Sequence, residues 1–158
     1  MDNGGIVIGL VIVVLVLRRQ LGTRPVHGRG PVILLGVLGL LGIAALAFGV
    51  ASVVQYHPLG AATIALTAAS LAVSAGFGAA RARTVRVWHA AEGRALRRGT
   101  VATAVLWFVS MAVHIGMDRW IDHTTGVGML GLSTLYLCLA VTLTVQHLCV
   151  RRRAATAS

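Results

Sequence analysis

Two ionisable side chains lie one helical turn apart within an apolar stretch. His114 and Asp118 are four residues apart, so a helix places them on one face. A histidine–carboxylate pair can transfer protons, and an ionisable group about one turn inside a membrane span is a functional candidate. Trp107 lies two turns before His114, where it would line the same pocket. One hypothesis is therefore general acid–base chemistry by this pair, with His57 and Trp107 as further candidate catalytic residues.

Two further histidines support a competing hypothesis, a metal site. His57 begins one predicted span and His123 follows another, so both could meet His114 at one end of a bundle. Zinc, copper or haem iron would accept such ligands. The chain has no H-E-x-x-H or comparable spacing, and the alternative is a set of interfacial polar residues, with Asp118 paired to Arg119 or His114. No metal or cofactor is evident from motifs, and none is assigned.

The elements that must position these residues are long apolar runs. Of 158 residues, 57% are hydrophobic and 11% are charged, whereas about a quarter of a soluble domain is charged. So few charges cannot cover a water-facing surface, which indicates lipid as the main solvent. We predict an all-α membrane protein, a single domain over residues 1–158. Its five transmembrane helices would span about residues 4–20, 31–54, 59–80, 100–117 and 127–150.

The arginines predict the orientation of this bundle. The segments 18–30, 81–99 and 151–158 carry 13 of the 14 basic residues, all of which are arginine, and Arg119 is the exception. The positive-inside rule puts these segments in the cytoplasm, with the N-terminus outside and the C-terminus cytoplasmic. The first span is short, and it completes this alternation. An Arg-, Ala-, Gly- and Val-rich composition is typical of GC-rich genomes such as those of actinobacteria, so we expect a multi-pass protein of a bacterial cytoplasmic membrane, with an actinobacterium as the expected source.

The net charge of +10 indicates an anionic binding partner. The arginines occur in short runs between apolar segments, which favours the bilayer, with anionic lipids of its inner leaflet, over nucleic acid. The sequence contains no phosphate-binding loop, no G-x-S-x-G and no DNA-binding motif. A homo-oligomer or a membrane-protein partner stays open. No internal repeat supports a transporter.

Stripes of small or weakly polar residues run along the later spans. Helices in lipid associate through close packing and hydrogen bonds, so we interpret these stripes as packing faces; a polar cavity or pathway is the alternative. The residues, span by span, are Gly36, Gly39, Gly42 and Gly49; Thr63, Thr67, Ser70 and Ser74; Thr103, Trp107, Ser110, His114 and Asp118; and Thr134, Cys138 and Thr142.

The segment 81–99 is the longest polar stretch. Thr84 to Trp88 is β-branched and aromatic, and Glu92-Gly93 is a turn signal, so we predict a two-stranded cytoplasmic hairpin. A short amphipathic helix is the alternative. Arginine forks grip phosphate, and tryptophan suits a membrane interface. The residues expected to contact headgroups or phosphate are Arg81, Arg83, Arg86, Trp88, Arg97 and Arg98.

The same segment carries a family resemblance. The pattern Arg-x-Arg-Thr-x-x-Val-Trp, then an acidic residue and Gly, then Arg-x-Gly-Thr and a span with Leu-Trp, resembles the CcdC-like family of small polytopic bacterial membrane proteins. Glu92 stands where the family pattern has Asp. The resemblance implies a polytopic topology, and the family, named for cytochrome c biogenesis, has no defined activity. The matching positions are Arg81, Arg83, Thr84, Val87, Trp88, Glu92, Gly93, Arg97, Gly99, Thr100, Leu106 and Trp107.

Three functions follow as hypotheses. The first is a non-catalytic membrane protein of accessory, scaffold or resistance type. The second is a membrane-embedded enzyme, for example a cyclase or isomerase, acting on an amphiphilic or isoprenoid-like substrate through His114 and Asp118. The third is metal or haem handling at the outer face.

Overall fold

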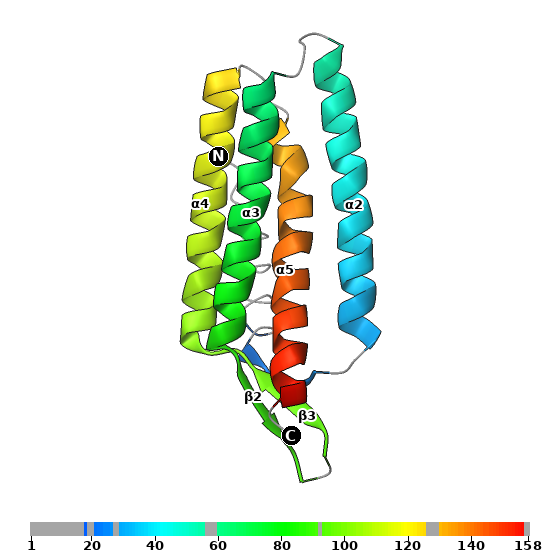
Figure 1. Ribbon diagram of the computed structural model, residues 1–158, viewed down its shortest axis with the longest axis vertical. Helices are drawn as coiled ribbons and strands as arrows, with labels where there is room; N and C mark the ends of the chain where they lie inside the picture. Colours follow the sequence, from blue (N-terminus) through cyan, green and yellow to red (C-terminus); the bar gives the residue numbers. More distant parts are fainter. Residues whose placement is uncertain are drawn as a thin grey trace, which may run out of the picture.

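The computed structural model describes residues 18, 21–26, 29–55, 60–91, 93–125 and 130–156. Within these residues the chain forms a bundle of long helices with a small sheet at one end, hereafter the sheet end (Figure 1). The helices are α2 (Arg29–Val54), α3 (Ala61–Thr84), α4 (Val101–Thr125) and α5 (Leu130–Thr156).

In this part of the chain, four helices are long and apolar enough to cross a membrane. Their outward faces are apolar as well, and Leu40 and Phe48 on α2 are each 71% exposed. The later four predicted spans are therefore confirmed as long apolar helices. The predicted first span, residues 4–20, lies outside the described residues apart from Arg18.

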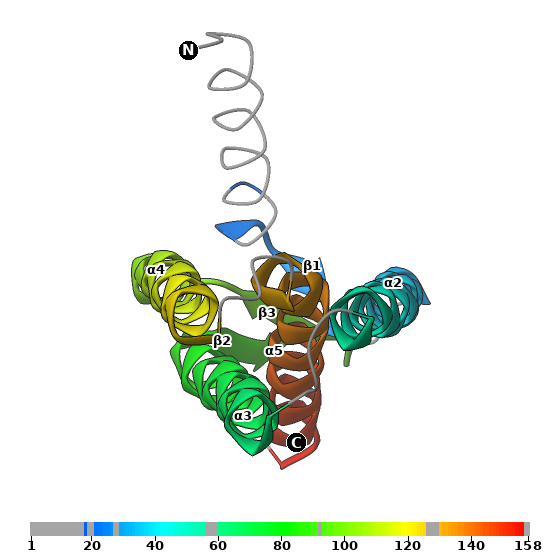
Figure 2. The ribbon, with the colours of Figure 1, turned by 90° about the horizontal axis from the view of Figure 1, so that it is seen from above.

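Helix α5 occupies the centre of the bundle. Helices α2 and α3 pack against it from different sides, and α4 packs mainly against α3 (Figure 2). A Cβ atom on Gly42 of α2 would lie 2.7 Å from the backbone of Leu137. The predicted glycine packing face is thus confirmed at Gly42, because only a residue without a side chain allows this approach. A Cβ atom on Gly36 or Gly39 would meet nothing within 4 Å.

Small polar side chains line the contact between α3 and α5. The Thr142 hydroxyl lies 3.1 Å from the Ser74 carbonyl across this contact and 2.7 Å from the Cys138 carbonyl on its own helix, donating to both. The Ser70 hydroxyl lies 3.7 Å from Cys138 Sγ. All four residues are buried. The interpretation of these stripes as packing faces is therefore confirmed for α3 and α5.

The sheet consists of β1 (Arg24–Pro25), β2 (Arg86–His89) and β3 (Ala95–Arg98), antiparallel in the order β1-β3-β2. Strands β2 and β3 form the predicted hairpin, and the alternative of an amphipathic helix is wrong. Gly93 in its turn has φ 72°, which an L side chain rarely adopts. Strand β1 was not predicted, and it adds an edge to the hairpin.

The sheet and the adjoining helix ends share an apolar core. It contains Val26, Val85 and Ala95 from the sheet region, packed against Val150 and Ala154 of α5. This cluster lies at the end of the bundle, where burial from water stabilises packing. A lone hairpin is marginal in water, so contact with α5 gives the hairpin the support it requires.

Several helices extend beyond their predicted ends. Helix α3 runs to Thr84 instead of residue 80, α4 to Thr125 instead of 117, and α5 to Thr156 instead of 150. The predictions followed the apolar runs. The extensions contain no Gly or Pro to end a helix, and on α5 the extension brings Ala154 into the core under the sheet.

Three threonines join the end of α3 to the start of α4. The hydroxyls of Thr84 and Thr103 lie 2.8 Å apart, and the Thr100 hydroxyl donates to the Thr84 carbonyl at 2.9 Å. The Thr103 hydroxyl accepts from the Thr100 amide at 3.0 Å, and the Thr100 hydroxyl accepts from the Thr103 amide at 3.3 Å. This reciprocal pair resembles a capping box, so it fixes where α4 begins.

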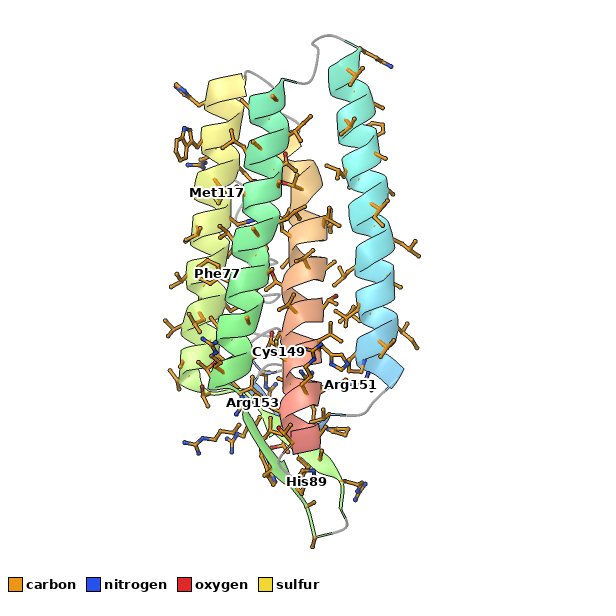
Figure 3. The ribbon with its side chains drawn as sticks, in the orientation of Figure 1. Phe77, His89, Met117, Cys149, Arg151 and Arg153 are labelled. Carbon is orange, nitrogen blue, oxygen red and sulfur yellow. The ribbon has the colours of Figure 1, made fainter. Side chains whose placement is uncertain are left out.

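Arg153 of α5 caps the end of α3. Its Nη1 donates to the carbonyl of Ala82 at 2.5 Å and to that of Val85 at 3.0 Å. These carbonyls lie where a helix end leaves its acceptors unsatisfied and carries partial negative charge, which a cation stabilises. Figure 3 shows Arg153 and Arg151 at the foot of α5, with Arg153 on the side of α3 and Arg151 on the side of α2.

Candidate functional site

A small polar cavity lies inside the bundle between α3, α4 and α5. Its volume is about 20 Å³, which is room for about one water molecule. Two lining residues come from α3, and four each from α4 and α5. The lining residues are Ser74, Arg81, Trp107, Ser110, Met111, His114, Leu135, Cys138, Leu139 and Thr142.

Two of the predicted catalytic residues line this cavity. His114 is 6% exposed, and its Nε2 has no hydrogen-bond partner among the described residues. Trp107 lies two turns along the same helix, and its ring packs edge-on against Phe108 with centroids 5.3 Å apart. Asp118 is half-buried one turn beyond His114 and is not among the lining residues. The helix face was thus predicted correctly for His114 and Trp107.

The predicted metal ligands do not come together in the described part of the chain. His123 is exposed in the last turn of α4. It follows His114 by nine residues, so the two lie on opposite helix faces, about 13 Å apart along the axis. His57 lies outside the described residues. Among the residues that are described, no group of three His, Cys, Asp or Glu side chains could hold a metal ion.

Arg81 is the largest fully buried side chain among the described residues. It is 1% exposed, it lines the cavity, and its Nε has no hydrogen-bond partner in the described part of the chain. Sequence analysis placed Arg81 among the headgroup-contacting arginines, and the structure places it inside the bundle instead. The physical reason is that α3 continues to Thr84, so Arg81 still belongs to the helix and faces α4 and α5.

A signal for this position was present in the sequence. The α3 stripe of Thr63, Thr67, Ser70 and Ser74 advances by three or four residues, and Arg81 lies seven residues beyond Ser74. Seven residues are two helical turns, so Arg81 continues the same face. The prediction missed the burial of Arg81 because it grouped Arg81 with the arginines that follow it in the sequence.

Two polar residues of α5 near the sheet end are also buried. Gln146 is 3% exposed and His147 is 7% exposed. The Oε1 atom of Gln146 has no hydrogen-bond partner among the described residues. Gln146 follows Thr142 by four residues, so it continues the inward face of α5.

The other predicted headgroup residues lie around the sheet. Arg83, Arg86 and Arg98 are exposed, and Arg97 is half-buried. Trp88 on β2 is 37% exposed. These positions leave the arginine side chains accessible to a charged surface, as the prediction requires.

Like charges face each other across the strands. Arg24 of β1 is directly opposite Arg97 of β3, and Arg86 of β2 is directly opposite Arg98. Like charges directly opposite in a sheet are destabilising. Successive residues of a strand point to opposite faces, so the two pairs lie on opposite faces of the sheet, and Arg86 and Arg98 share their face with Trp88. An anionic surface in contact with that face would reduce the repulsion between Arg86 and Arg98. We call Arg24, Arg86, Arg97 and Arg98 the arginine pairs.

The chain therefore offers two chemically distinct places: an internal cavity with a buried cation, and an arginine-rich sheet. The first can hold a small polar or anionic group, and the second can hold an extended anionic surface. Comparison with known proteins adds nothing to this list, because no protein-family model, no curated protein and no solved structure matches the chain.

Proposed function

We propose that the chain is a non-catalytic accessory protein of a bacterial cytoplasmic membrane, which holds its arginine-rich sheet against the anionic inner leaflet. The observation that carries this proposal is the register of the sheet, which places Arg86 directly opposite Arg98 on the face that also carries Trp88. An anionic headgroup layer would place countercharge beside Arg86 and Arg98, at roughly 1 kcal/mol for each arginine near the surface.

The proposal includes the five-span topology, with the N-terminus outside and the sheet in the cytoplasm. The distribution of arginine supports it, since the described arginines gather at the sheet end and Arg119 lies near the opposite end of α4. The exposed apolar faces of the helices support a lipid environment. The first span, residues 4–20, remains a prediction from the sequence.

The test uses Trp88 as a reporter of contact with lipid. Trp107→Phe and Trp120→Phe leave Trp88 as the one tryptophan in the chain. This variant is placed in nanodiscs that contain either brominated phosphatidylglycerol or brominated phosphatidylcholine, and tryptophan quenching is measured. We expect stronger quenching by the anionic lipid, because Arg86 and Arg98 gather it on the face of the sheet that carries Trp88.

The control distinguishes the sheet from general charge. Arg86→Gln together with Arg98→Gln should abolish the preference for the anionic lipid. Arg119→Gln, near the other end of α4, should leave it intact. Equal quenching by the two lipids in the starting variant would show the proposal to be wrong, as would a loss of preference in Arg119→Gln.

The other hypotheses stay predictions. An enzyme acting on an isoprenoid-like substrate would use His114 and Trp107 in the cavity, but a volume of about 20 Å³ holds no such chain without movement of the helices. Metal handling depends on His57, which is outside the described residues. The CcdC-like resemblance supports an accessory class and names no reaction.

A further inference from the structure

We propose that the cavity beside Arg81 binds an oxyanion, namely the phosphate or carboxylate group of a membrane amphiphile or of a small free anion. This site is separate from the sheet: the arginine pairs lie on the strands, whereas Arg81 points into the bundle from the last turn of α3. The proposal does not depend on the proposed function.

The first argument is the state of Arg81 itself. A guanidinium taken out of water needs a paired charge or a full set of acceptors, because its burial is otherwise costly. Arg81 is 1% exposed, its Nε has no partner among the described residues, and no carboxylate belongs to the described cavity lining. The side chain therefore presents an unused donor to the cavity.

The second argument is the chemistry of the donor. The Nε–H and Nη–H groups of arginine form a planar fork that matches two oxygens of a phosphate or carboxylate. A neutral ligand would offer acceptors without the opposing charge. The fork therefore favours an oxyanion over a neutral polar group.

The third argument is the opposite end of the cavity. His114 lines it, is 6% exposed, and has an unpartnered Nε2 among the described residues. Ser74 and Thr142 direct their hydroxyl hydrogens at backbone carbonyls, at 2.8 Å for Ser74. They line the cavity without competing for the anion as free donors. Arg81 and His114 are the lining side chains with a buried, unpartnered nitrogen among the described residues, so we assign the position of the anion to them.

The size of the cavity adds a condition. A volume of about 20 Å³ takes a water-sized group, and a phosphate needs more room. Helix α4 packs less extensively against α5 than α3 does, so α4 is the helix that can move outward. An anionic head would then enter between α4 and α5 with Trp107 beside it.

The experiment measures binding by calorimetry with the full chain in a neutral detergent. The probes are dioctanoyl phosphatidic acid, inorganic phosphate and the uncharged dioctanoylglycerol. The wild type should bind phosphatidic acid saturably and dioctanoylglycerol at least tenfold more weakly. Arg81→Gln should weaken phosphatidic acid binding by roughly tenfold or more, the range of a hydrogen bond to a charged group. The matched control Arg83→Gln, exposed two residues along the same helix end, should bind within twofold of wild type.

The two sources of the oxyanion separate in the same titrations. Binding of inorganic phosphate that competes with phosphatidic acid identifies a small-anion site, and binding of phosphatidic acid alone identifies an amphiphile site. Either result supports the proposal. No saturable binding of either probe, or equal binding of dioctanoylglycerol, would overturn it.

If Arg81→Gln does not fold, two milder variants test the site instead. Arg81→Lys keeps the charge and loses the fork, and His114→Gln alters the other end of the cavity. Both should weaken phosphatidic acid binding at least threefold in protein that is monodisperse and helical. Wild-type affinity in both variants, or in folded Arg81→Gln, refutes the site.

Discussion

Gly78 provides the sharpest test of how α3 and α5 are held together. A Cβ atom at this position would lie 2.5 Å from the carbonyl oxygen of Thr142, whereas ordinary contact begins at 3.4 Å. In Gly78→Ala the two helices must therefore separate by about 1 Å. The hydrogen bond from the Thr142 hydroxyl to the Ser74 carbonyl, now 3.1 Å, would then be lost.

The expected cost follows from these changes. Overpacking costs about 1–3 kcal/mol, and the lost hydrogen bond adds about 1 kcal/mol. Replacing glycine by alanine in a helix returns up to about 1 kcal/mol. The net free energy of unfolding should fall by about 2 kcal/mol, mainly through overpacking.

The assay is unfolding by SDS in mixed micelles, followed by far-ultraviolet circular dichroism. The matched control is Gly76→Ala on the same helix, where a new Cβ would meet nothing within 4 Å. Gly76→Ala should be as stable as wild type or slightly more stable. If Gly78→Ala unfolds at the same SDS fraction as Gly76→Ala, the close approach of α3 and α5 does not exist as described.

Two further predictions use the same SDS assay. Arg153→Ala should lower the free energy of unfolding by about 1 kcal/mol, because α3 loses its C-terminal cap; this value allows for the solvent exposure of Arg153. The control Arg152→Ala, at the exposed neighbouring position, should have a smaller effect. Equal losses in the two variants would contradict the cap. Thr103→Val should cost about 1–2 kcal/mol because it leaves the Thr100 amide without its acceptor and removes the contact with the Thr84 hydroxyl, which keeps only its bond to the Arg81 carbonyl. A smaller loss than in Thr67→Val, where the hydroxyl bonds only its own helix, would contradict the role of the three threonines.

Much of the fold could be predicted from the sequence. The four later spans follow from the length of their apolar runs, and the hairpin follows from β-branched residues beside Gly93. Strand β1 could not be predicted, because a strand of Arg24 and Pro25 has no alternating pattern. Its partner is set by tertiary contact: the Val26 amide donates to the Ala95 carbonyl at 2.9 Å, which places Val26 in the core under the sheet.

The candidate site was predicted in part, for a physical reason. The helical repeat places His114 and Trp107 on one face of α4, so the sequence alone predicts that both side chains line the same cavity. Burial of Arg81 depends on where α3 ends, and helix ends depend on caps supplied by distant residues such as Arg153 and Thr100. The apolar run ends before Arg81, whereas the helix does not. Charge was therefore a misleading guide to exposure at this position.

The central place of α5 has a consequence for biosynthesis. Helices α2 and α3 emerge from the ribosome before α5, and each finds its main packing surface on α5. Until α5 is inserted, α2 lacks that surface. The α3 groups that later bond to α5, such as the Ser74 carbonyl, then face lipid or an insertion factor. Helices α3 and α4, joined by their threonines, can pair first. We therefore expect the bundle to close in one late step, with α5 recruiting α2 and the α3–α4 pair together.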